Sequence, residues 1–256
     1  MNRPFLFWLC YQPYKWLVLY PFMVLSTFFF AALAILLAST VSQRLGSMIA
    51  GKYWARVIAM LTPMSVDLQG TEHIDSNKSY VIVSNHQSLY DIFVLYGWLP
   101  VDFKWVMKHE LRKLPALGSS CEKLGHIFID RSNRTRAIAT LNEAKQRIVN
   151  GTSVIFFPEG TRSLGKGLRP FKKGAFHMAI ELGLPILPLS ILGTRDIQPA
   201  KSFDTYPGRA TMLVHEPIPV EMFKDNVEGL MTEARQAIAF GLGEAVEESA
   251  RNQARA

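Results

Sequence analysis

The chain has 256 residues, 49% of them hydrophobic, and a formal net charge of +7. This length holds one catalytic domain with its own core, so stability requires neither disulfides nor a structural metal. The two cysteines, Cys10 and Cys121, lie far apart and form no CxxC pair, which argues against zinc-ribbon and thioredoxin-like proteins. The positive charge favours an anionic partner. Because no dense basic run or aromatic RNA-binding pattern is present, we expect that partner to be lipid and expect no nucleic acid.

An uncharged apolar stretch from Leu17 to Ser39 predicts a membrane segment. A helix of this length spans roughly 35 Å, enough for a hydrocarbon core of about 30 Å. Trp16 and Tyr20 stand where interfacial aromatic residues occur. A cleaved signal peptide is the main alternative, but its apolar core is usually only about 7–15 residues long. Whether the segment spans the bilayer or, kinked near Pro21, enters one leaflet stays open.

The stretch from Gly46 to Met64 mixes Lys52 and Arg56 with apolar side chains. It suits a helix lying partly in the membrane interface, and an ordinary amphipathic helix packed on the following domain is the alternative. We therefore expect residues 1–45 to form an N-terminal membrane segment and residues 46–256 to form the catalytic domain. Basic residues flank the apolar stretch too evenly to fix its orientation.

After Pro63, short apolar runs alternate with stretches of helical spacing. Strands are expected over Tyr80–Ser84, Ser153–Phe157, Ile186–Leu192 and Ala210–His215, and helices over Leu89–Trp98, Arg134–Val149, Gly174–Leu182 and Asn226–Glu247. This alternation predicts an α/β fold with a mixed, largely parallel sheet flanked by helices, preceded by the membrane helix or helix pair.

A polar segment containing His86 and Asp91 directly follows the first predicted strand. In a continuous helix these residues would point about 140° apart, so they meet only if His86 lies in the preceding loop and Asp91 in the first helical turn. The carboxylate would then hold one ring nitrogen as a donor and leave the other as a proton acceptor. A His-x4-Asp spacing also occurs often by chance. No Gly-x-Ser-x-Gly elbow accompanies it and Cys121 has no base nearby, so we expect the acceptor's own hydroxyl to be the nucleophile.

A second polar turn follows another predicted strand. It places Glu159, Thr161 and Arg162 at a strand end, the usual ligand side of an α/β sheet. The guanidinium of Arg162 is a planar donor fork suited to phosphate. Lys172 and Lys173 add two ammonium groups before a predicted helix, whose N-terminus also favours anions. A charged surface turn would explain each feature alone, but not as readily both together.

Four segments in this order resemble the motifs of the glycerolipid acyltransferase family, particularly bacterial 1-acyl-sn-glycerol-3-phosphate acyltransferases. They are Asn85–Asp91 (NHQSLYD), Gly125–Arg131 (GHIFIDR), Phe157–Ser163 (FPEGTRS) and Leu184–Leu189 (LPILPL). The resemblance implies transfer of a fatty acyl group from acyl-CoA or acyl-carrier protein to the sn-2 hydroxyl of lysophosphatidic acid, giving phosphatidic acid. It also implies a place at the cytoplasmic (inner) membrane, with the catalytic domain facing the cytoplasm.

The same resemblance assigns roles to individual residues. His86 would be the base and Asp91 its orienting partner. The glycerol phosphate would be surrounded by Glu159, Gly160, Thr161 and Arg162, with Arg131 and Lys108 as additional phosphate ligands. An ordinary exposed lysine is the alternative for Lys108, and a buried strand is the alternative to an acyl-chain role for the fourth segment.

No cofactor is implied beyond the acyl donor, and the histidines and acids show no metal-ligand spacing. Three alternatives remain open: an acyltransferase for another lysophospholipid or an acylated amino-acid lipid, a non-catalytic lipid-binding membrane protein, and a lipid hydrolase.

Overall fold

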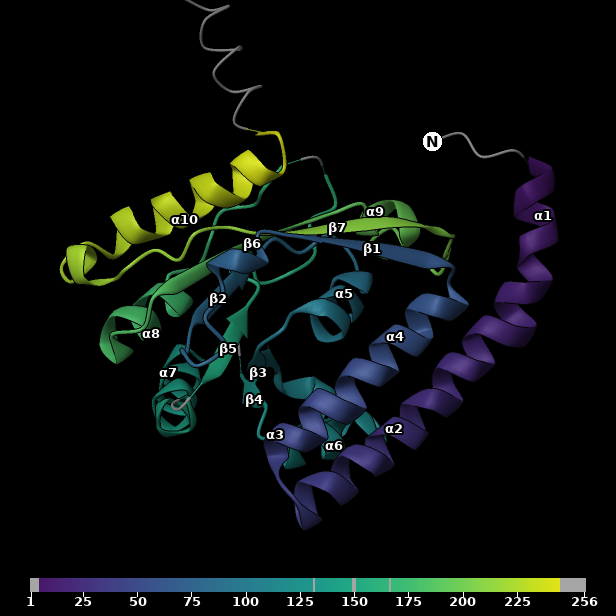
Figure 1. Cartoon of the computed structure of the whole chain (residues 1–256), viewed down its shortest axis with the longest axis horizontal. Coiled ribbons are helices and arrows are strands. Elements are labelled where there is room, and N and C mark those ends of the chain that lie inside the picture. The colour runs from purple at the N-terminus through teal and green to yellow at the C-terminus, as the bar shows by residue number, and fades with distance from the viewer. Residues whose placement is uncertain (1–4, 131, 149–150, 166, 245–256) are drawn as a thin grey trace, which may run out of the picture.

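The computed structural model describes residues 5–130, 132–148, 151–165 and 167–244. Its centre is a seven-stranded sheet in the order β1-β7-β6-β2-β5-β3-β4 (Figure 1). The strands are β1 (Met64–Gln69), β2 (Val81–Ser84), β3 (Asp102–Lys108), β4 (Ile127–Ile129), β5 (Thr152–Phe156), β6 (Ile186–Leu192) and β7 (Gly208–Val214). Only β6 and β7 pair antiparallel; all the other neighbours are parallel. The predicted mixed, largely parallel sheet is confirmed.

Helices cover both faces of this sheet. They are α1 (Phe5–Tyr14), α2 (Tyr20–Thr40), α3 (Gln43–Gly46), α4 (Lys52–Leu61), α5 (Tyr90–Trp98), α6 (Leu117–Lys123), α7 (Arg134–Ala144), α8 (Gly174–Leu182), α9 (Thr194–Ile197) and α10 (Val227–Gly241). One core lies between the sheet and helices α4 and α5, and a second core lies between the sheet and helices α7, α8 and α10. The predicted helix from Asn226 ends at Gly241, and its last expected residues, 245–247, lie outside the described residues.

Strand β2 shows why the sheet is buried on both faces. Val81 and Val83 point into one core and Ile82 into the other, and none of the three side chains is exposed. Successive side chains of a strand alternate between faces, so an uninterrupted apolar run is stable only when helices cover both sides. The parallel neighbours β5 and β6 hold β2 in place, which fixes the position of the loop that begins at Asn85.

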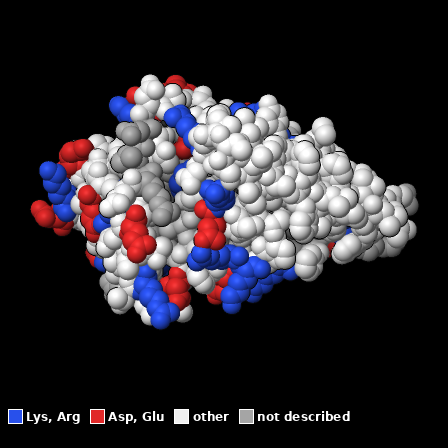
Figure 2. Space-filling view, turned by 90° about the horizontal axis from the view of Figure 1, so that it is seen from below, with Lys and Arg blue, Asp and Glu red and all other residues white. Residues whose placement is uncertain are grey.

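The N-terminal helices form a pair that lies beside the catalytic domain (Figure 1). The helical stretch Leu9–Thr40, which includes the π-helical turn η1 (Lys15–Leu19), is long and apolar enough to cross a membrane. The chain then reverses at Ser42, whose hydroxyl accepts the Leu45 N–H, and returns through α3, η2 (Ser47–Gly51) and α4. Figure 2 shows that the face formed by these helices is almost free of Lys, Arg, Asp and Glu. The predicted N-terminal helix pair is therefore present.

Helix α4 packs on the catalytic domain. Its Ala55 and Ile58 are fully buried, and the ring of Trp54 makes an edge contact with Phe93 of α5 at 5.1 Å. Met60, by contrast, is 70% exposed on the other side of α4. One face of this helix is thus packed on the domain, and whether its exposed face lies in the membrane interface stays a prediction. The domain boundary at residue 45 stays a prediction.

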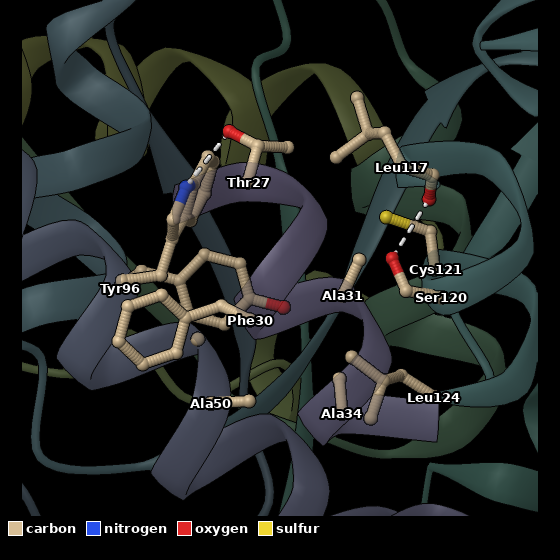
Figure 3. Close-up of a pocket in the computed structure, with 12 residues that line it drawn as sticks. Thr27, Phe30, Ala31, Ala34, Ala50, Tyr96, Leu117, Ser120, Cys121 and Leu124 are labelled. Carbon is tan, nitrogen blue, oxygen red and sulfur yellow. Dashed lines mark hydrogen bonds between the residues drawn. The ribbon is translucent and has the colours of Figure 1, made fainter. Parts of the chain in front are cut away.

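A small apolar cavity of about 50 Å³ lies where the helix pair meets the domain (Figure 3). Ala31 and Ala34 of α2 line one side, and Tyr96 of α5 and Cys121 of α6 line the other. Burial raises the pKa of the Cys121 thiol to about 12. This thiol is therefore protonated at neutral pH and fills space as a small apolar side chain.

Candidate active site

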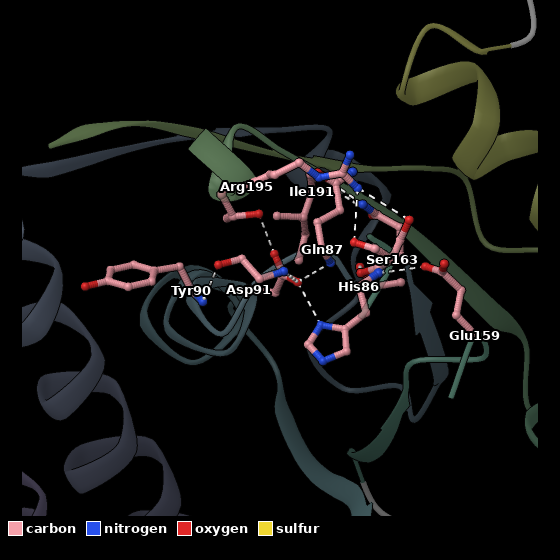
Figure 4. A network of polar contacts seen from close by, with 12 residues as sticks. His86, Gln87, Tyr90, Asp91, Glu159, Ser163, Ile191 and Arg195 are labelled. Carbon is pink, nitrogen blue, oxygen red and sulfur yellow. Dashed lines mark hydrogen bonds and ion pairs between the residues drawn. The ribbon is translucent and has the colours of Figure 1, made fainter. Parts of the chain in front are cut away.

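The predicted contact between His86 and Asp91 is present (Figure 4). His86 lies in the loop between β2 and α5, and Asp91 lies in the first turn of α5. The Nδ1 atom of His86 is 2.8 Å from Oδ2 of Asp91. A carboxylate accepts and does not donate, so Nδ1 carries the proton and Nε2 holds a free lone pair. The imidazole side chain is 15% exposed, whereas Asp91 is fully buried.

Three further groups donate to the Asp91 carboxylate. The backbone N–H groups of Gln87 and Ser88 donate to Oδ2 at 2.7 and 2.8 Å, and the hydroxyl of Thr194 donates to Oδ1 at 2.6 Å. Together with His86, these donors engage both carboxylate oxygens, so Asp91 is fixed in position beside His86, as an orienting partner requires.

Phe157 fixes the plane of the imidazole. The rings of His86 and Phe157 stack with centroids 3.9 Å apart and an interplanar angle of 10°. Trp105 of β3 packs behind Phe157 with a centroid distance of 5.9 Å. One face of the imidazole is thus covered by aromatic carbon, which leaves the ring edge carrying Nε2 as the polar surface of this side chain.

Glu159 ties the His86 loop to the next strand-end loop. Its Oε1 accepts the backbone N–H of His86 at 2.8 Å, and its Oε2 accepts the backbone N–H of Arg169 at 3.0 Å. Glu159 is only 4% exposed, and burial raises the pKa of its carboxyl even though both backbone contacts lower it. Its place beside a phosphate stays a prediction, and these contacts favour a positioning role.

The end of β6, where α9 begins, is the third strand end that holds the site together. The backbone N–H of Ser163 donates to the His86 carbonyl at 2.7 Å, and Arg195 donates through Nη2 to the Ser163 carbonyl at 3.3 Å. Next to Arg195 is Thr194, which holds Asp91. Asn85 adds two bonds of 2.8 Å between its side-chain amide and the backbone of Ile191 in β6. The ends of β2, β5 and β6 are thereby locked together (Figure 4).

The sequence interpretation missed Thr194 and Arg195. Both follow the strand that the sequence predicts over Ile186–Leu192, in the segment Gly193-Thr194-Arg195. Ligand sites of α/β proteins lie at the carboxyl ends of the strands, which is why Glu159 was predicted. The same reasoning applies to the end of this strand and would have predicted Thr194 and Arg195 as site residues.

Gly160 and Lys172 form the cationic side of the site. Gly160 has a φ of +76°, and a Cβ at this position would lie 2.9 Å from Cε of Lys172, so the lysine stem crosses directly over the glycine. Arg162 is half-buried, and within the described residues it has no acidic partner. Thr161 between them is exposed. The turn thus presents a guanidinium and an ammonium group, both available to an anion.

Other predicted cations are less free. Lys173 forms an ion pair with Glu228 of α10, and Lys108 pairs with Glu110 at 2.8 Å, both on exposed surfaces. Arg131 lies outside the described residues. The fourth sequence segment is part of β6, and its side chains from Ile186 to Leu189 are buried, which supports the buried-strand interpretation.

A cavity of about 440 Å³ is lined in part by Phe157, the ring that stacks on His86, and His86 itself is not among its lining residues. Phe157, Gly160, Lys172 and Lys173 line one part of it. The remaining walls are mainly apolar and come from the following residues: Val106, Ile129, Ala137, Ile138, Leu141 and Phe156. A site with ammonium groups at one side and hydrocarbon at the other suits a molecule that is both anionic and apolar.

The fold and the site define a class of protein, the acyltransferases. Residues 65–192, half of the chain, match the family model described as Acyltransferase, and the chain belongs to this family. Within it, the chain belongs to the family of 1-acyl-sn-glycerol-3-phosphate acyltransferases, although it spans less than two thirds of the length of some of these relatives. The resemblance drawn from the four motifs is confirmed.

Three relatives document this family. A 1-acyl-sn-glycerol-3-phosphate acyltransferase of Chlamydomonas reinhardtii is 35% identical over 203 residues, which are 78% of this chain and 59% of that protein. The alpha form from Ovis aries is 31% identical over 90% of this chain and 81% of the relative. The crystal structure of the 1-acyl-sn-glycerophosphate acyltransferase PlsC from Thermotoga maritima superposes with a TM-score of 0.72 at 28% identity, covering 88% of this chain and 95% of that one.

Proposed function

We propose that this protein transfers a fatty acyl group from acyl-CoA or acyl-carrier protein to the sn-2 hydroxyl of lysophosphatidic acid, giving phosphatidic acid. The observation that carries the proposal is the His86–Asp91 contact at 2.8 Å, in which the His86 ring stacks on Phe157, a residue that lines a cavity with ammonium and apolar walls. The names of the relatives from Chlamydomonas reinhardtii and Ovis aries support the choice of acceptor.

His86 is the general base in this mechanism. Its Nε2 takes the proton of the sn-2 hydroxyl while that oxygen attacks the thioester carbonyl carbon. The resulting tetrahedral intermediate collapses as the C–S bond breaks, and the departing thiolate receives the proton from the imidazolium. Asp91 stabilises the imidazolium through its Nδ1 contact and holds the ring in one orientation throughout.

The cationic turn binds the acceptor phosphate. Arg162, Thr161, the backbone of Gly160 and the ammonium group of Lys172 surround the phosphate, and Glu159 holds their loop against His86. Fixing the phosphate presents one hydroxyl to Nε2, which converts binding energy into orientation. Lys173 and Lys108, whose ammonium groups pair with Glu228 and Glu110, are more peripheral members of the proposed set, which also includes Arg131 on the resemblance alone.

The protein acts at a membrane in this proposal. The apolar stretch Leu9–Thr40 inserts into the inner membrane, either across it or into one leaflet, and the catalytic domain faces the cytoplasm. Protease treatment of sealed spheroplasts tests this orientation: the catalytic domain should survive in intact spheroplasts and be cleaved after lysis. Cleavage from the outside would refute the orientation and leave the chemistry untouched.

The experiment that tests the chemistry is an acyl-transfer assay with lysophosphatidic acid and each thioester donor, with the product identified by mass. His86→Ala should lower kcat by about 10²–10⁴-fold, the usual contribution of a positioned base. His109→Ala is the matched control, because His109 is exposed and lies outside the cavity lining. Near-normal transfer by His86→Ala would refute the mechanism, and free fatty acid as the main wild-type product would indicate a hydrolase.

A further inference from the structure

The loop from Pro199 to Tyr206, which connects α9 to β7, is fastened to the N-terminal helix. Lys15 forms an ion pair with Asp204 at 2.9 Å, and the Lys15 side chain is only 3% exposed. The hydroxyl of Tyr20 donates to the Phe203 carbonyl and lies 3.0 Å from the Thr205 hydroxyl. These contacts join segments about 190 residues apart in the sequence and fix the loop at the level of η1 (Lys15–Leu19).

The Lys15–Asp204 pair has a clear physical reason. Lys15 is a charged residue within the apolar stretch Leu9–Thr40, and a buried ammonium group without a counter-ion is costly. Asp204 supplies that counter-ion from the catalytic domain. The loop is therefore held at one depth along the helix, and the depth of the catalytic domain follows from it.

An apolar patch results from this docking. The backbone of Phe203 faces the helix, but its side chain is 76% exposed. On the neighbouring turn η1, Trp16 is 54% exposed and Leu17 is 76% exposed. Lys201, two residues before Phe203, is also exposed. An exposed apolar group beside a membrane helix, with a cation next to it, is the composition of a lipid-interface contact.

We infer that the loop Pro199–Tyr206 is a second membrane contact, in which Phe203 enters the phospholipid interface beside η1 and Lys201 faces the phosphate groups. This inference rests on the proposed insertion of the N-terminal helix. The partner is the surface of a phospholipid bilayer, because the Phe203 carbonyl and Asp204 tie the loop to the very helix that the bilayer surrounds in the proposed function.

The segment just before this loop contacts the catalytic loop. Thr194, the first residue of α9, donates to Asp91 at 2.6 Å, and the Ser88 hydroxyl donates to the carbonyl of Gln198, the residue before Pro199, at 2.8 Å. Residues 194–206 therefore run from the His86 site to the proposed lipid contact without an intervening element other than α9. The membrane contact sets the height of the catalytic site above the lipid that carries its acceptor.

A fluorophore attached at single cysteines tests this contact. The background is the full-length chain with Cys10→Ser; Cys121 is retained because it is buried and its thiol has a pKa of about 12. An environment-sensitive thiol label is placed by Phe203→Cys, by Leu17→Cys as the lipid-embedded reference, and by Met222→Cys as the aqueous reference. Met222 is 81% exposed in η6 (Glu221–Phe223), the turn that leads into α10, and α10 lies far from α1 in Figure 1. Each labelled protein is reconstituted into phosphatidylglycerol–phosphatidylcholine bilayers.

We expect the label at position 203 to shift to the blue and to be quenched by brominated lipids, as at position 17, whereas the label at position 222 keeps its aqueous spectrum. A lipid response at 17 together with an aqueous spectrum at 203 would overturn the loop contact alone. Aqueous spectra at both positions would overturn the insertion of the helix as well. A blue shift at 203 in lipid-free detergent that grows with protein concentration would identify a second copy as the partner and refute the lipid contact.

Discussion

Replacing Thr194 by valine removes one hydrogen bond from the Asp91 carboxylate and leaves the side-chain shape almost unchanged. The Thr194 hydroxyl is 2.6 Å from Oδ1 of Asp91, and both residues are fully buried, so no water replaces the lost donor. A hydrogen bond to a buried charged group contributes about 1.5–3 kcal/mol. Without this donor the Asp91 carboxylate is held less firmly, so it should fix the His86 ring less well in its catalytic orientation.

The assay is acyl transfer at pH 7.5 with the wild type and Thr194→Val. A less firmly oriented His86 is a weaker general base, so kcat should fall by about 10-fold while the KM for lysophosphatidic acid stays nearly unchanged. The free energy of unfolding at pH 7.5 should fall by about 1.5–3 kcal/mol. Thr194→Ser keeps the hydroxyl and should restore kcat. Thr232→Val, whose hydroxyl only bonds a carbonyl of its own helix, should change neither measurement.

The reasoning fails if Thr194→Val is destabilised but keeps the wild-type kcat. In that case Thr194 would be a structural residue with no effect on the catalytic pair. Equal losses of kcat in Thr194→Val and Thr194→Ser would also refute it, because the serine variant retains the donor.

Three further substitutions test other residues of the protein, two in the turn beside His86 and one in the core. Glu159→Gln puts an amide donor against a backbone N–H, so urea unfolding at pH 7.5 should show a loss of about 1–3 kcal/mol, and an unchanged free energy would contradict the positioning role. Gly160→Ala places a side chain at φ +76° and against Lys172, so we expect a loss of about 1–3 kcal/mol and a raised KM for lysophosphatidic acid. Burial lowers the pKa of His126 to about 3 from 6.5, so its contribution to stability is complete above pH 6.5 and is lost as the pH falls toward 3. The stability difference between the wild type and His126→Gln should therefore narrow by about 2 kcal/mol between pH 7.5 and pH 5, and a constant difference would refute the assignment.

The strand ends at the site were predictable because the sequence features that indicate them lie within a few neighbouring residues. The buried run before Ser84 predicts a strand, and the polar residues after it can only form a loop and a helix start. The sequence therefore placed His86 and Asp91 on either side of a helix boundary, where they meet in the structure. The turn after Phe156 follows by the same logic, and parallel pairing of β2 with β5 brings the two turns to one edge.

Strands β1, β3 and β4 were not predicted, and β3 shows why. It carries Asp102 and Lys104, which a sequence pattern assigns to the surface, yet they are 3% and 5% exposed. Their charged groups lie 3.9 Å apart and partly compensate each other, while burial lowers the pKa of Lys104. A buried charged pair is recognisable only once its partner is placed. The contacts of Thr194 with Asp91 and of Lys15 with Asp204 join distant segments and have no local signal either.

The turn at Glu159–Arg162 contains one acidic and one positively charged residue, and the contacts of Glu159 indicate a different role for each. A carboxylate facing a phosphate would repel it, and the repulsion would be strong in a partly buried site. Both oxygens of Glu159 are instead engaged by backbone N–H groups, one of them from His86. Arg162, which is half-buried, has no carboxylate partner within the described residues to compete with a ligand. We therefore assign Glu159 to holding the general base, His86, in place and Arg162 to binding the phosphate. Glu159→Gln, which removes the charge but keeps the side-chain shape, should then lower kcat more than it changes the affinity for the acceptor. Arg162→Gln should chiefly raise the KM for lysophosphatidic acid.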